Sequence, residues 1–180
     1  MNLADINQVA VNSRFLYLQM VGYMASVDGD LDHSELELLT EMIQSLQLPE
    51  DLATEVLKLP RLDDDQLKSG FEQIQSENLQ YSFVLDLIIM AMADGFLHDA
   101  ERVYLAKVND WVKIPRADFH NLVYFAQTAN SIVDPKNIDP MAQYVIDNFF
   151  LWARQSHINL FQQTHFAQNE SIDQYLKNEL

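Results

Sequence analysis

Carboxylate side chains recur in two short stretches of this sequence at the same spacing. Asp28 is followed seven residues later by Glu35, Asp94 is followed seven residues later by Glu101, and each aspartate precedes a glycine. Hard divalent cations prefer carboxylate oxygens as ligands. Like charges about 4 Å apart repel by about 4 kcal/mol at an effective dielectric near 20, and a bound cation would reverse that repulsion. We therefore expect a divalent-cation site built from Asp28, Glu35, Asp94 and Glu101.

Further oxygen and imidazole ligands flank the same two stretches. They are Asp30, Asp32 and His33 in the first copy, and His98 and Asp99 in the second. The expected ion is calcium, magnesium or manganese, or zinc if the two histidines take part with carboxylates completing four ligands. No organic cofactor is expected, because the Walker and Rossmann signatures do not occur.

The first copy does not follow the EF-hand pattern. Asp28, Asp30 and Asp32 fit the first, third and fifth positions of that loop. The sixth position holds His33 where the loop needs glycine, and the twelfth holds Leu39 where it needs glutamate. An EF-hand is therefore rejected.

The two stretches belong to an internal duplication. Equivalent residues of the two copies are always separated by the same interval as Asp28 and Asp94, and we call this interval the repeat offset. Unrelated stretches of this composition would share roughly one or two such positions by chance. Two copies predict a pseudo-twofold domain rather than an extended solenoid. Residues repeated identically at this offset include Met24, Ala25, Asp28, Gly29, Leu31, Glu35 and Pro49.

Composition and capping signals predict an all-α fold, a compact bundle of about seven to nine helices. The chain has four glycines and five prolines in 180 residues, and it is rich in helix formers. We expect a helical domain over residues 1–135, with repeats over about 10–75 and 76–135, and a helical extension over 136–180 packed on it. Predicted helices cover about 7–27, Asp32 to Leu46, Pro49 to Leu57, a segment from Asp63, the equivalent segments of the second copy as far as Ala126, and about 140–155.

A purely structural explanation of the repeated stretch stays open. Asp32 and Glu35 can form a capping box, worth about 1 kcal/mol, and the two glycines can end helices. This explanation accounts less well for Asp28 and Asp94, because a carboxylate in the last turn of a helix faces the negative end of the helix dipole.

Charge and composition exclude several classes of function. The net charge of −16 opposes binding to nucleic acid and to anionic membrane surfaces. The longest apolar run, 87–93, is too short to cross a bilayer, and the N-terminus does not resemble a signal peptide, so we expect a cytoplasmic protein without direct membrane insertion. No catalytic constellation is found, and no enzymatic activity is expected. The aromatic residues Trp111, Tyr124, Phe149, Phe150 and Trp152 are expected in the core, with any exposed subset serving as a docking patch.

The two stretches resemble the TerB family, the tellurite-resistance-associated domain that is also similar to the N-terminal region of a membrane-anchored DnaJ-like co-chaperone. The family phrase stands here as Ala25-Ser-Val-Asp28-Gly29-Asp-Leu31-Asp-His-Ser-Glu35 and Ala91-Met-Ala-Asp94-Gly95-Phe-Leu97-His-Asp-Ala-Glu101. The resemblance covers roughly residues 10–130.

The resemblance implies an all-helical domain with an acidic face that binds divalent metal. It also implies a non-enzymatic role in tellurite or chemical-stress response through other proteins, including membrane-associated ones. The second copy departs from the first, since Phe96 and His98 replace Asp30 and Asp32, so we do not expect equal metal occupancy of the two stretches. The alternative is a metal-independent protein-interaction module with an acidic docking face.

Overall fold

The protein is an all-α structure. The computed structural model describes residues 2–3, 9–26, 31–59, 61–93, 99–132, 137–156 and 159–160. Within these residues, eight helices and one two-residue parallel strand pair are found, which confirms the predicted fold class. The elements are β1 (Asn2–Leu3), α1 (Val11–Ala25), α2 (His33–Ser45), α3 (Glu50–Leu57), α4 (Asp64–Ser76), α5 (Gln80–Ala91), α6 (Asp99–Val112), α7 (Arg116–Asn130), α8 (Pro140–Gln155) and β2 (Asn159–Leu160).

Local sequence signals explain where several helices begin. Asp32 and Asp63 each form a capping box at the start of α2 and α4. Asp139 accepts hydrogen bonds from the first turn of α8, whose first residue is Pro140. These side chains satisfy backbone N–H groups that have no partner inside the helix. The predicted starts of these three helices are therefore confirmed.

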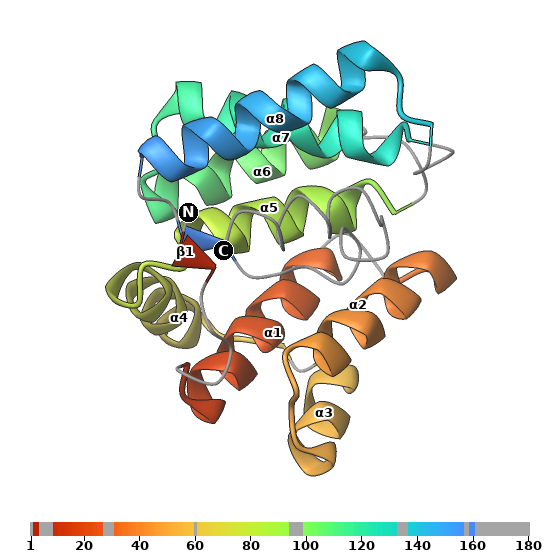
Figure 1. Ribbon diagram of the computed structural model, residues 1–180. Coiled ribbons are helices and arrows are strands. Elements are labelled where there is room, and N and C mark those ends of the chain that lie inside the picture. Colours follow the sequence, from red (N-terminus) through yellow and green to blue (C-terminus); the bar gives the residue numbers. More distant parts are fainter. Residues whose placement is uncertain are drawn as a thin grey trace.

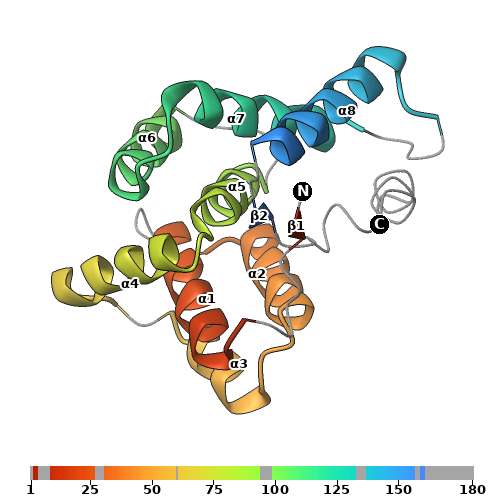
Figure 2. The same ribbon diagram turned by 60° about the vertical axis from the view of Figure 1, so that its left-hand side comes forward.

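Helix α5 lies at the centre of the molecule. In Figures 1 and 2 it runs between α1 and α2 on one side and α7 and α8 on the other. Nine consecutive residues, Ser82 to Met90, are buried. A helix that is apolar around its whole circumference must be covered on all sides, and α5 packs against α1, α2, α4, α6 and α7.

The helix boundaries follow the repeat offset. The last residues of α1 and α5 are related by it, and so are the first residues of α2 and α6 and the first residues of α3 and α7. Gln47 and Lys113, equivalent under the same offset, both have left-handed backbone, with φ of 48° and 61°. The two halves thus share helix order and one unusual turn conformation, while the pseudo-twofold axis stays a prediction.

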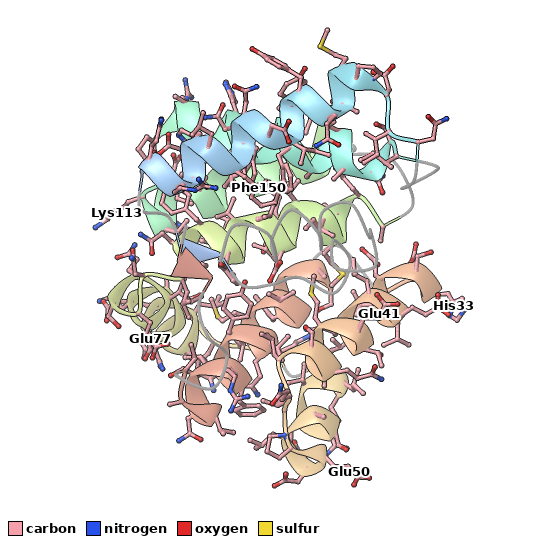
Figure 3. All side chains as sticks on the ribbon, in the orientation of Figure 1. His33, Glu41, Glu50, Glu77, Lys113 and Phe150 are labelled. Carbon is pink, nitrogen blue, oxygen red and sulfur yellow. The ribbon has the colours of Figure 1, made fainter. Side chains whose placement is uncertain are left out.

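The segment beyond the second repeat supplies α8, which packs against α7. The rings of Phe125 and Phe149 stack across these helices with centroids 3.8 Å apart, and Phe150 lies between α8 and α5 (Figure 3). The helices expected in 156–180 fall mostly outside the described residues, and the described pair 159–160 is a strand instead. The predicted division at residue 135 stays a prediction.

Candidate functional site

The start of α2 holds the best described part of the predicted metal site. Glu35 N–H donates to Asp32 Oδ1 at 2.9 Å, and Asp32 N–H donates to Glu35 Oε2 at 2.9 Å. The reciprocal bonds hold both carboxylates against the first turn of the helix. The predicted capping box is confirmed, so part of the repeated pattern has a structural role.

Two further candidates lie at helix starts on the surface. His33, the first residue of α2, is exposed, and its Nε2 lies 3.2 Å from Glu37 Oε1 one turn along the same helix. Asp99, the first residue of α6, is also exposed. Glu101 is in the first turn of α6, but its side chain lies outside the described part. His33 thus contacts a glutamate that is not among the predicted ligands.

The remaining candidates lie outside the described residues. These are Asp28, Asp30, Asp94 and His98. Among the described side chains, no three His, Asp or Glu residues come close enough together to hold a metal ion. The convergence of Asp28, Glu35, Asp94 and Glu101 therefore stays a prediction.

The helix ends correct one step of the sequence argument. Helix α1 ends at Ala25 and α5 at Ala91. Asp28 and Asp94 therefore come three residues after the ends of their helices, and the expectation that they lie in the last helical turn is wrong. Because the dipole effect falls off within the last turn, it no longer counts against a structural role. The case for a metal site then rests on the repeated spacing of the carboxylates and on the arrangement of the helices beside them.

The helix ends beside the two stretches lie on the same side of the molecule. In Figure 1, α1 and α5 both run towards the right, and α2 begins there, as the label of His33 in Figure 3 marks. Helix α5 packs against both α1 and α2. The helices that lead into the two stretches are therefore packed together and point the same way.

A buried polar contact joins those two helices. The Tyr17 hydroxyl on α1 donates a 2.6 Å hydrogen bond to Asp86 Oδ2 on α5, and both side chains are buried. Burial raises the pKa of Tyr17 well above its usual value, and the charge and hydrogen bond of Asp86 raise it further. This pair is not among the residues predicted from the sequence. Its signal was a lone carboxylate inside the apolar run of α5.

A second buried group joins α1 to the other end of α2. Arg14 Nη1 donates to the carbonyl oxygen of Leu46 at 2.7 Å, and Leu46 caps the C-terminus of α2. A guanidinium there satisfies a free carbonyl and opposes the negative end of the helix dipole. Together with the Tyr17–Asp86 contact, this bond fixes α1 relative to α2 and α5.

Two surface cavities contain aromatic residues that were expected in the core. One, of about 430 Å³ between α4 and α6, contains Trp111, whose ring lies 5.2 Å from that of Phe71. The other, of about 440 Å³ between α7 and α8, contains Tyr124. Trp111 and Tyr124 are exposed, so their expected core position is wrong, while Phe149 and Phe150 are buried as expected. An aromatic residue on a helix can face either the core or a neighbouring groove, and only packing decides between them.

Comparison with known proteins finds one family. A family model described as "Tellurite resistance protein TerB" matches residues 17–123, more than half of the chain. The matched region includes both Asp-Gly stretches and ends before α8. Comparisons with curated proteins and with solved structures give no match. Among the described helices, none combines the length and the apolar character needed to span a membrane.

Proposed function

We propose that this chain, which belongs to the TerB family, is a non-enzymatic, divalent-metal-binding adaptor that acts in the cytoplasm. It would contribute to a tellurite or chemical-stress response through protein partners, some of them membrane-associated. The observation that carries the proposal is the Asp-Gly pattern with its later glutamate, which occurs twice between helices that begin and end at equivalent positions of the two repeats.

The described carboxylates suit a hard cation. Asp32 and Glu35 are held by backbone hydrogen bonds that use Oδ1 of one and Oε2 of the other. A carboxylate has two oxygens with about four lone-pair sites, so capping a helix and binding a cation are compatible roles. The net charge of −16 also raises the local concentration of cations around the protein.

The proposed ligands are Asp28, Glu35, Asp94 and Glu101. The first copy would bind more tightly than the second, because it has two further carboxylates, Asp30 and Asp32. Each added oxygen ligand of suitable geometry favours calcium, magnesium or manganese. The ion would reduce repulsion within the acidic surface, so its binding changes the charge that a protein partner meets.

One observation favours the alternative of a metal-independent interaction module. The capping box satisfies backbone donors at the start of α2 without any ion, so Asp32 and Glu35 have a role that needs no metal. In this alternative the acidic surface meets a basic partner directly, and electrostatic attraction speeds association.

Calorimetric titration of metal-free protein with calcium, magnesium, manganese and zinc tests the first proposal. We expect binding well below millimolar concentration, weakened at least about tenfold, or 1.4 kcal/mol, by combining Asp28→Asn with Asp94→Asn. The matched control combines Asp65→Asn with Glu72→Gln, two exposed acids of α4, and should leave affinity unchanged. An equal loss of metal affinity in both variants would mean that the ion responds only to the overall negative charge. The absence of any binding would refute the metal site.

Partner capture in the presence of a chelator distinguishes the alternative. An adaptor that needs metal loses its partners when the ion is removed, whereas a metal-independent module keeps them. The Asp28→Asn and Asp94→Asn variant should behave like the chelated wild type if the metal proposal holds. Retention of partners under both conditions supports the interaction module instead.

A further inference from the structure

The groove between α7 and α8 is lined by both buried and exposed aromatic side chains. Phe125 and Phe149 are buried beneath it and stack on one another. On the surface around it, Tyr124, Tyr144 and Met141 are 57%, 64% and 66% exposed. All five residues line the same cavity of about 440 Å³. Almost all of the groove lies beyond residue 123, where the family match ends.

This combination has the composition of a docking surface. Single exposed apolar residues are ordinary, but large side chains gathered around one cavity mark an interaction site. The stacked rings beneath provide a rigid floor, while methionine at the rim adapts its shape to a ligand. Asn121 and Asn148 also line the groove and supply polar groups beside the apolar centre, as interfaces commonly have.

A segment of the same chain has the matching pattern. Ile172, Tyr175, Leu176 and Leu180 are spaced at i, i+3, i+4 and i+8, a spacing that a helical conformation would bring to one face. The residues between them are mostly polar or charged. An apolar stripe on a short amphipathic helix, laid into an apolar groove, is a common mode of peptide recognition.

The connection to the body allows this segment to reach the groove. Strand β2 ends at Leu160, is paired with β1 and lies against α5. Residues 161–171 can extend over roughly 36 Å, whereas a domain of this length has a radius of gyration of about 16 Å. A tethered segment acts at millimolar effective concentration, which favours it over a second copy or a free helix from another protein.

We propose that residues 161–180 dock in the α7–α8 groove, with the stripe of Ile172, Tyr175, Leu176 and Leu180 against Tyr124, Met141 and Tyr144. The tail then covers the exposed aromatic residues of its own chain. The proposal does not depend on metal binding, because no predicted ligand lines the groove.

A paramagnetic label on the tail tests the proposal in the full chain. The protein has no cysteine, so Asn178→Cys provides a unique attachment site off the apolar stripe. We expect the backbone amide signals of Asn121, Tyr124 and Asn148 to lose most of their intensity, compared with the reduced label. Signals from α3 should keep theirs, because α3 packs on α1 in the other half of the molecule.

Rim substitutions provide the matched control. Combining Met141→Ser with Tyr144→Ser should restore the groove signals, and both side chains are exposed enough for the fold to persist. Combining Leu57→Ser with Val103→Ser removes two exposed apolar side chains outside the groove and should restore nothing. Uniform broadening, or none at the groove, would overturn the proposal. So would broadening seen only when labelled and unlabelled chains are mixed, which would assign the groove to a second copy.

Discussion

Tyr17, Asp86 and Arg14 are buried side chains that carry polar groups, and each is hydrogen-bonded between two elements. The Tyr17 hydroxyl joins α1 to the Asp86 carboxylate of α5, and Arg14 joins α1 to the carbonyl of Leu46, the C-cap residue of α2. Burying such groups is costly unless they are hydrogen-bonded, so these contacts are specific for one arrangement of the helices. They determine how the helices leading into the two Asp-Gly stretches are aligned.

We predict that Tyr17 makes the folded protein less stable as the pH rises above about 10. Its pKa in the folded protein is raised above its usual value by burial and by Asp86. Above pH about 10 the unfolded chain loses this proton while the folded protein keeps it. The free energy of unfolding should therefore fall with rising pH, by up to about 1.4 kcal/mol per pH unit. Urea unfolding between pH about 8 and 11 measures this slope.

The Tyr17→Phe variant should lose the Tyr17 contribution to this slope. At neutral pH it should be less stable by about 1.5–3 kcal/mol, because a hydrogen bond to a charged group is removed. Tyr81→Phe is the comparison, since burial and the hydrogen bond to Asp118 also raise the pKa of half-buried Tyr81. That variant should also lower the slope, because both tyrosines keep their protons in the folded protein across this pH range. An unchanged slope in Tyr17→Phe would contradict the assignment.

At the scale of elements, close helix contacts depend on small residues at particular places. A Cβ atom added to Gly70 of α4 would lie 2.6 Å from the Sδ atom of Met20 on α1. Met20 is buried, so its side chain has little room to move. Gly70 is therefore needed for α4 to approach α1 closely. Its role is to leave room for the Met20 side chain, and it does not depend on the backbone freedom of glycine.

Gly70→Val should destabilise the protein by about 1–3 kcal/mol, the usual cost of overpacking a filled core. Ser69→Val, one residue earlier on the same helix and exposed, should change stability by no more than about 0.5 kcal/mol. Chemical denaturation of both variants measures the difference. If the two variants lose stability equally, the effect belongs to helix propensity and not to the contact with Met20.

At the scale of the whole molecule, the dominant feature is a charge of −16 on 180 residues. Such a charge keeps a protein dispersed and repels phosphate backbones, but its self-repulsion weakens the compact state. Cations that reduce this repulsion, whether screening salt or a bound metal, should therefore stabilise the fold. Screening depends on the ionic strength alone, whereas binding depends on which cation is present, so measurements at equal ionic strength separate the two effects.

Raising NaCl from about 10 to 150 mM shortens the screening length from about 30 to 8 Å and should raise the melting temperature. At equal ionic strength, calcium or magnesium should raise the melting temperature further if a site exists. A hundredfold excess of the ion over its Kd would add about 2.7 kcal/mol to the free energy of unfolding. Thermal unfolding measures both effects. The Asp28→Asn and Asp94→Asn variant should keep the first increment and lose the second; a second increment that persists there would argue against these ligands.

The parts that could be predicted from the sequence are those with local causes. Asp32, Asp63 and Asp139 begin helices because their side chains bond backbone donors two or three residues away, and that interaction is complete within one turn. The repeat offset could likewise be found by comparing the chain with itself. The TerB family followed from the same repeated residues.

Tertiary structure decided what depends on partners distant in the chain. Local spacing cannot tell that Tyr124 and Trp111 face grooves while Phe149 and Phe150 face the core, or that Asp86 meets the distant Tyr17. These outcomes depend on which helix covers which face. Neighbouring residues suffice to specify the helix starts at Asp32, Asp63 and Asp139 and the repeated carboxylates, because each depends only on residues close in the chain. Packing determined the buried polar contacts and the α7–α8 groove, because these exist only once separate helices are brought together.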